Sequence, residues 1–336
     1  MELLVAMVLA VLIIGGTLVI YQTHSRFYYR QQALMEQEQN LRSALYMIAR
    51  DVRMAGDGLS VMGVSAAQIY VPEPSGKGGS WFAYPGNKPG EPPEKPGVRA
   101  IFGRDSDKGP DSLTVFRSET ESSLAFGQLG ENFNASDPRL VFANPIPEGS
   151  VASKDVIGLV NGKNALLLQA GSISPSSSTR QAIALGPRFK PGSSLPGGIS
   201  FPAGSYVYNL RDVSLTTFFI DQNRNNLMAR YHHLDSLDYD SPKDSAVILA
   251  PGIEDLQVRY VLNDQDPGQG FDGLSMGALE NDEVVRQVNL GLVGISGARS
   301  PTAANQPISL FNHIPNAPKD GFPRSVVTSM VQLRNY

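Results

Sequence analysis

The pattern of apolar and polar residues divides the chain into one long helix and a region of short strands. Residues 3–20 (LLVAMVLAVLIIGGTLVI) form an apolar run without a charged side chain. An α-helix of that length reaches about 27 Å, which nearly matches the hydrocarbon core of a bilayer. The alternative is a secretory signal peptide, but its apolar region is shorter and ends at a small-residue cleavage site. We therefore expect residues 3–20 to form a transmembrane helix.

The helix is expected to continue well beyond this run. No proline occurs before Pro72, and Gly56 and Gly58 provide the first stop signals. Over residues 21–56, Gln, Glu and Arg surround one apolar stripe at helical spacing, formed by Leu34, Leu41, Leu45, Ile48 and Val52. We predict one helix over residues 1–56, on the order of 80 Å long, with an amphipathic second half. Its stripe either packs against the downstream domain, the interpretation that we favour, or forms a membrane-proximal stalk or coiled coil.

The rest of the chain has the character of a β protein. Residues 72–98 are almost half Pro and Gly, which indicates a long surface loop. The turn DQNRNN at 221–226 predicts a hairpin. We expect an α+β fold, with a β-rich head over residues 57–336 for which two antiparallel sheets are one arrangement. Runs with strand character lie at 98–102, 112–117, 139–143, 156–160, 165–169, 206–210, 213–220, 227–232, 246–249, 256–262, 284–295 and 326–333.

Composition and charge exclude several classes of function. The chain has no Cys, which excludes a disulfide framework and Cys-ligated metal sites. Its four His and net charge of −4 argue against a surface for nucleic acid. The motif H-E-x-x-H does not occur. We therefore expect no enzyme, no nucleic-acid partner and no cofactor.

An acidic loop provides one weak candidate for a ligand site. Residues 268–273 fit G-x-G-x-x-G, but no helix is expected after them, and the carboxylates of Asp264, Asp266 and Asp272 would repel a phosphate. The same carboxylates could hold Ca²⁺, a cation that prefers oxygen ligands. A solvated hairpin loop is the simpler interpretation, and it is the one we adopt.

Two further segments contain residue types that bind metals. Residues 221–225 begin like a calcium loop, but Asn226 and His232 stand where an EF-hand needs Gly and Glu. His232 and His233 precede a set of acidic residues, namely Asp235, Asp238 and Asp240. Adjacent residues on a strand point to opposite faces, so the two imidazoles would not share a metal there. We expect this segment to be a loop at a strand end without a metal.

The first residues of the chain resemble the mature N-terminus of the type IV pilin and pseudopilin family. The position of Glu2 alone is consistent with two roles. Its carboxylate either lies among the lipid headgroups, near the positive end of the helix dipole, or pairs with a functional partner inside the membrane. Residues 1–7 (MELLVAM) match the family motif F-T-L-[IM]-E-L-L-V-A-[ML] from its fourth position onward. The resemblance implies that Glu2 pairs with the N-terminal amine of a neighbouring subunit and that Leu3, Leu4 and Val5 join the assembly contact. It also implies that the start was assigned late or that the chain was clipped, because the family's leader and first three mature residues precede the matched part.

Three later blocks narrow the resemblance to PilW-type minor pilins. Residues 44–56 (ALYMIARDVRMAG) resemble the helix end of these proteins and of J-type pseudopilins. Residues 251–260 (PGIEDLQVRY) and 324–335 (RSVVTSMVQLRN) resemble two PilW-like blocks near the C-terminus. The blocks lie in the expected order, whereas residues 58–250 contain no motif that we can place.

The resemblance implies a minor pilin of a Gram-negative bacterium that joins the initiation or tip complex of a type IV pilus by helix-bundle assembly. Such a subunit waits in the inner membrane with its head in the periplasm, and its partners are other minor and major pilins, the assembly machinery, membrane lipid and a tip adhesin. Arg26 and Arg30 argue for the opposite orientation, but the family's basic leader outweighs them. The alternatives are a minor pseudopilin of type II secretion and a membrane-anchored adhesin or sensor.

Overall fold

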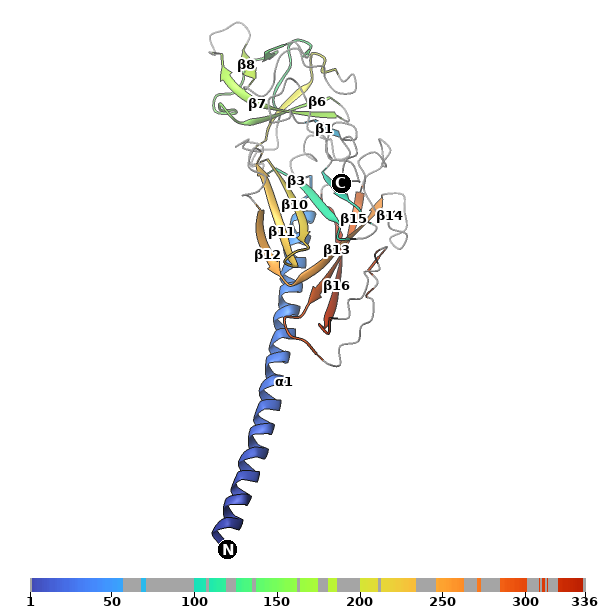
Figure 1. Cartoon of the computed structure of the whole chain (residues 1–336). Coiled ribbons are helices and arrows are strands. Elements are labelled where there is room, and N and C mark those ends of the chain that lie inside the picture. The colour runs from blue at the N-terminus through green and yellow to red at the C-terminus, as the bar shows by residue number, and fades with distance from the viewer. Residues whose placement is uncertain are drawn as a thin grey trace.

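Helix α1 (Glu2–Arg53) runs without interruption and carries a β-rich head at its C-terminal end in the computed structural model (Figure 1). The structure describes residues 2–56, 68–70, 100–106, 109–118, 125–134, 137–161, 164–174, 181–185, 200–210, 213–233, 246–262, 271–272, 285–300, 308, 310–311, 313 and 320–334. The predicted order of one long helix followed by a β-rich head is therefore confirmed.

The helix ends close to the predicted stop signal. Gly56 has a φ of 73°, a left-handed conformation that glycine adopts without strain and that commonly terminates helices. Its N–H donates to the carbonyl oxygen of Phe116 at 2.9 Å, so the helix end is attached to the head as it terminates.

Two antiparallel sheets pack against one side of the second half of the helix. In the five-stranded sheet the order is β12 (Ala246–Pro251), β11 (Asn226–His233), β10 (Ser214–Asp221), β3 (Ser112–Arg117) and β2 (Ile101–Arg104). In the four-stranded sheet it is β14 (Phe271–Asp272), β13 (Ile253–Leu262), β15 (Val285–Ile295) and β16 (Arg324–Gln332). These strands and the helix share one hydrophobic core, and we call this part of the head the base lobe.

A third sheet forms a separate lobe at the end of the head farthest from the N-terminus (Figure 1). Its six-strand path is β4 (Ala125–Gln128), β9 (Tyr206–Leu210), β6 (Val156–Asn161), β7 (Asn164–Ile173), β8 (Ala182–Leu185) and β5 (Arg139–Val141). Strand β1 (Gln68–Tyr70) pairs with β7 in parallel. This distal lobe has its own hydrophobic core, so the expectation of two sheets is corrected to three.

Apart from β1, the strands of the distal lobe lie in the sequence between two neighbouring strands of the base lobe. Strands β3 and β10 pair antiparallel, with Arg117 opposite Ser214. The chain therefore leaves the base lobe at the end of β3 and returns to it at the start of β10, so the distal lobe stands where a hairpin would have its turn. Each predicted strand run overlaps an observed strand, while β1, β4, β8 and β14 escaped prediction because they span only two to four residues.

The apolar stripe of the helix lies against the head only in part. Leu41, Ile48 and Val52 are 0% exposed and Leu45 is 9% exposed, all within the base-lobe core. Leu34, in contrast, is 41% exposed and is not part of that core. The predicted stripe thus packs against the chain's own head from Leu41 onward, and Leu34 does not take part in that packing.

Candidate functional site

The N-terminal part of α1 is bare among the described residues. In the membrane-length apolar window none of the surface is buried, and Leu3, Leu4 and Val5 are 79%, 67% and 59% exposed. Glu2 lies in the first helical turn at the free end of this segment. The described part of the chain thus contains one helix long and apolar enough to cross a membrane. This segment is the natural candidate for a membrane anchor.

Large exposed side chains also line a second face of the helix, outside the predicted apolar stripe. Tyr21, Tyr28, Met35 and Tyr46 are between 67% and 70% exposed. At about 100° per residue, their spacings of seven, seven and eleven keep all four within roughly 20° of one line along the helix. The line extends from the apolar segment up to the level of the head, so this exposed face is available to another helix.

Hydrogen bonds from the helix fix it to the base lobe where the two first meet. The amide nitrogen of Gln37 donates to the carbonyl oxygen of Gly294 at 2.6 Å, and Asn40 donates to the carbonyl oxygen of Pro251 at 3.4 Å. Gln37 is only 4% exposed, and its Oε1 has no hydrogen-bond partner in the described structure. The hydrogen bond therefore orients the helix against β15, but it leaves a buried acceptor unpaired, which lowers its net contribution to stability.

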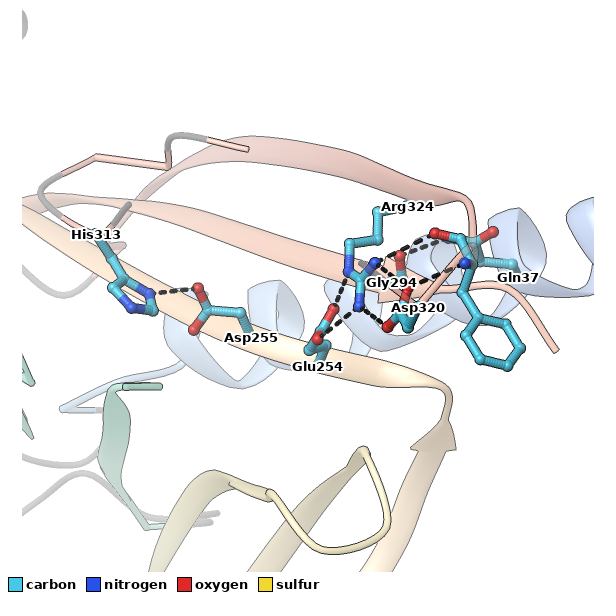
Figure 2. Close-up of polar contacts among 8 residues, drawn as sticks. Gln37, Glu254, Asp255, Gly294, His313, Asp320 and Arg324 are labelled. Atoms are coloured by element: carbon cyan, nitrogen blue, oxygen red, sulfur yellow. Dashed lines mark hydrogen bonds and ion pairs between the residues drawn. The ribbon is translucent and has the colours of Figure 1, made fainter. Parts of the chain in front are cut away.

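Two of the PilW-like blocks meet at Arg324. Its guanidinium donates to both carboxylate oxygens of Glu254, at 2.6 and 3.1 Å, and to both of Asp320, at 3.1 and 2.7 Å (Figure 2). Hydrogen bonding from Arg324 lowers the pKa of Asp320 to about 2. Hydrogen bonds to Asp320 and Glu254 in turn raise the pKa of Arg324. Glu254 precedes the β13 core residues and Arg324 begins β16, so this bidentate pair joins strands on either side of β15.

The other polar residues of block 251–260 point into the head. Asp255 Oδ2 lies 2.7 Å from His313 Nδ1 (Figure 2), and the Gln257 amide donates to Asp255 Oδ1 at 3.0 Å and to the Gly109 carbonyl oxygen at 3.1 Å. Asp255, Gln257 and His313 are 3%, 0% and 6% exposed. Because these groups are buried and bonded to one another, they position strands and do not form an open site, although Gln257 Oε1 has no hydrogen-bond partner in the described structure.

Asp111 connects the two sheets of the base lobe. Its N–H donates to the Leu256 carbonyl oxygen at 2.8 Å, while its carboxylate accepts from the N–H groups of Val258 at 2.8 Å and Ser106 at 3.0 Å. Burial raises the pKa of Asp111 to about 8, even though both N–H donors favour the charged form. A cleft of about 550 Å³ lies beside it, lined in part by Ser112 and Asp221.

The helix-end block completes the attachment. Asp51, 7% exposed, lies 3.1 Å from a guanidinium nitrogen of Arg50 and 3.9 Å from one of Arg117. The N–H of Arg334 donates to the carbonyl oxygen of Arg53 at 3.4 Å. Thus the blocks 44–56, 251–260 and 324–335, distant in the sequence, are brought together where the helix enters the head.

The predicted ligand-binding segments lead to one correction. His232 and His233 lie within strand β11, opposite Leu215 and Ser214 of β10, because the β10–β11 ladder is longer than predicted; they do not form a loop. The hairpin at 221–226 is confirmed, with Asp221 opposite Asn226.

The remaining segments lie wholly or partly outside the description. The side chains of both histidines and of Asp272 lie outside the described residues, as do Asp264, Asp266, the acidic residues 235–240 and the loop 72–98. Where the structure does describe side chains, no group of three or more His, Cys, Asp or Glu could hold a metal ion.

A long, bare apolar helix whose second half is packed into an antiparallel β head defines a pilin-like protein. Residues 217–335 match the family model described as Type IV Pilus-assembly protein W. This match confirms the resemblance to PilW, and it covers the base-lobe strands from β10 to β16 while leaving out the distal lobe. Over residues 217–335 the chain is therefore similar to the type IV pilus-assembly proteins.

A solved type IV-like pilin from Thermus thermophilus is 14% identical, over 54% of this chain and 84% of that chain, with a TM-score of 0.25. The search of curated proteins found no match.

Proposed function

We propose that this protein is a minor pilin that joins the initiation or tip complex of a type IV pilus. The observation that carries the proposal is the PilW match over the strands that hold the long, bare helix. The subunit waits in the inner membrane of a Gram-negative bacterium, with its head in the periplasm, until other pilins and the assembly machinery take it up. Its role is structural, without catalysis or a cofactor.

Assembly in this proposal is the non-covalent packing of helices. Leu3, Leu4 and Val5 exchange lipid for the apolar side chains of neighbouring subunits, and the exposed line that includes Tyr28 and Tyr46 continues the contact up to the head. Glu2 neutralises the N-terminal amine of a neighbour in the low dielectric of the bundle. Because an unpaired buried charge costs about 3–5 kcal/mol, this pair also selects the register of the subunits.

The size of the head favours a position at the tip. A compact head of roughly 280 residues has a radius of gyration near 19 Å, whereas helices in a bundle pack only about 8–10 Å apart. The distal lobe adds its bulk at the end of the head away from the helix (Figure 1). At the tip no further subunit has to stack above this lobe, and its surface can meet a partner such as a tip adhesin.

The test is complementation of a strain that lacks the gene. Deletion should strongly reduce the number of filaments while the remaining ones keep their diameter. Wild type and Glu38→Ala should restore the number, because Glu38 is an exposed acid whose partner is Arg42 on the same helix. Glu2→Ala should insert into the membrane but reduce incorporation by more than about a hundredfold, the effect of a loss of 3 kcal/mol.

Three results would contradict parts of the proposal. Wild-type incorporation of Glu2→Ala would refute the charge pair. Gold-labelled antibodies against the head, if spread evenly along the filaments, would refute the tip position. Normal filaments together with loss of type II secretion would instead identify a minor pseudopilin.

A further inference from the structure

A cluster of large side chains directly follows the apolar segment of α1. Tyr21, Phe27, Tyr28 and Tyr29 are 70%, 57%, 67% and 65% exposed. The rings of Tyr28 and Tyr29 meet edge to face, with their centroids 6.4 Å apart. They lie below the first hydrogen bond between helix and head, which Gln37 makes. These aromatic rings are therefore presented to whatever surrounds the helix.

The cluster surrounds the helix. At about 100° per residue, Phe27 and Tyr29 point roughly 100° to either side of Tyr28, and Arg26 and Arg30 occupy the opposite side. A partner helix would contact one side only and would leave the other rings in water. A medium that encloses the helix on all sides fits this arrangement better.

The chemistry of these side chains matches the interface of a bilayer. Tyr carries a polar tip on an apolar body, Arg can extend its charge toward water, and both are favoured among lipid headgroups. No acidic residue occurs between Leu3 and Met35, so Arg26 and Arg30 give the segment a positive charge suited to anionic lipid.

The distance of these rings from the apolar run also matches the headgroup region of a bilayer. Tyr21 follows the apolar run directly, and Phe27 to Tyr29 lie about 10–14 Å beyond its end, in the headgroup region or at its outer edge. Helix side chains lean toward the N-terminus, which brings the rings closer to the hydrocarbon. From Tyr29 to Gln37 the helix rises about another 12 Å.

We infer that residues 21–30 form a girdle that binds the lipid headgroups of the leaflet on the head's side and sets the depth of the helix in the bilayer. The girdle keeps the Gln37 contact with the base lobe roughly 12 Å from Tyr29, so the part of the exposed helix face that includes Met35 and Tyr46 remains accessible to a partner before assembly. This inference rests on the membrane-anchored state in the proposed function.

The test measures the depth of the full chain in vesicles of phosphatidylcholine with and without phosphatidylglycerol. Because the chain has no Cys, Ile20→Cys provides a single site for a fluorophore, which nitroxide lipids quench from shallow or deep positions. Replacing Phe27, Tyr28 and Tyr29 together by Ser should raise the ratio of shallow to deep quenching about twofold, since the helix moves outward without its aromatic anchors. Tyr46→Ser, an equally exposed ring at the level of the head, is the matched control and should leave the ratio unchanged.

The lipid dependence provides a second readout. Arg26→Gln with Arg30→Gln should remove the difference between vesicles with and without phosphatidylglycerol. An unchanged quenching ratio in the triple variant, or an equal change in Tyr46→Ser, would overturn the girdle while leaving the anchor intact. If alkaline carbonate released the wild-type chain from the vesicles, the anchor itself, and with it the girdle, would be refuted.

Discussion

The packing between helix and sheet can be tested at Leu41 of α1 and Gly294 of β15. A Cβ added at Gly294 of β15 would lie 2.8 Å from both Cγ and Cδ1 of Leu41, and Leu41 is 0% exposed. Overpacking of this kind costs about 1–3 kcal/mol. Replacing Gly by Ala also lowers the conformational entropy of the unfolded chain, which offsets about 0.5–1 kcal/mol of this cost. Gly294→Ala should therefore destabilise the protein by about 1–2 kcal/mol.

A second substitution, Leu41→Ala, allows the coupling between residues 41 and 294 to be measured. Leu41→Ala should cost about 2–5 kcal/mol, because it removes a buried side chain and leaves a cavity. In the double variant the added methyl group of residue 294 enters that cavity. The combined loss should then be smaller than the sum of the single losses by at least about 1 kcal/mol.

The free energy of unfolding is measured by urea titration of the full chain in detergent micelles, followed by near-ultraviolet circular dichroism. Gly297→Ala is the control, since nothing lies within 4 Å of a Cβ at that position and Gly297 has no positive φ. Additivity of Gly294→Ala and Leu41→Ala to within about 0.5 kcal/mol would refute close packing between α1 and β15. A Gly294→Ala variant as stable as Gly297→Ala would refute it as well.

Two further predictions concern the polar groups of the base lobe. Arg324→Ala should lower the free energy of unfolding by about 2–4 kcal/mol, because Glu254 and Asp320 lose their shared partner. Arg324→Lys should restore only part of this stability, since lysine lacks the bidentate fork. Equal stability of the Ala and Lys variants in the urea titration would contradict this prediction. For Asp111, whose pKa is raised from 3.8 to about 8, folding takes up a proton between these values, so stability should fall as pH rises from 5 to 8. Asp111→Asn should flatten this slope in thermal unfolding at a series of pH values, and an unchanged slope would refute the assignment.

Local patterns in the sequence predicted the long helix and all strands except β1, β4, β8 and β14. The absence of proline before Pro72 and the glycine at residue 56 defined α1 and its end, because helix continuation and termination depend on neighbouring residues. The DQNRNN turn identified the β10–β11 hairpin for the same reason. Two of the PilW-like blocks, residues 251–260 and 324–335, lie within residues 217–335, which match the family model.

Only the tertiary structure decided what these elements face. Leu34 and Leu41 share one helical stripe, yet only Leu41 is buried, because only Leu41 lies in the core that the helix shares with the sheets. Likewise, β3 pairs with β10 across the inserted lobe, and Arg324 meets Glu254 from 70 residues away. Alternation within a strand determines which side chains share a face, but it carries no information about the partner strand. The distal lobe, the contacts between the blocks and the buried Asp111 therefore follow from long-range packing, which no local pattern encodes.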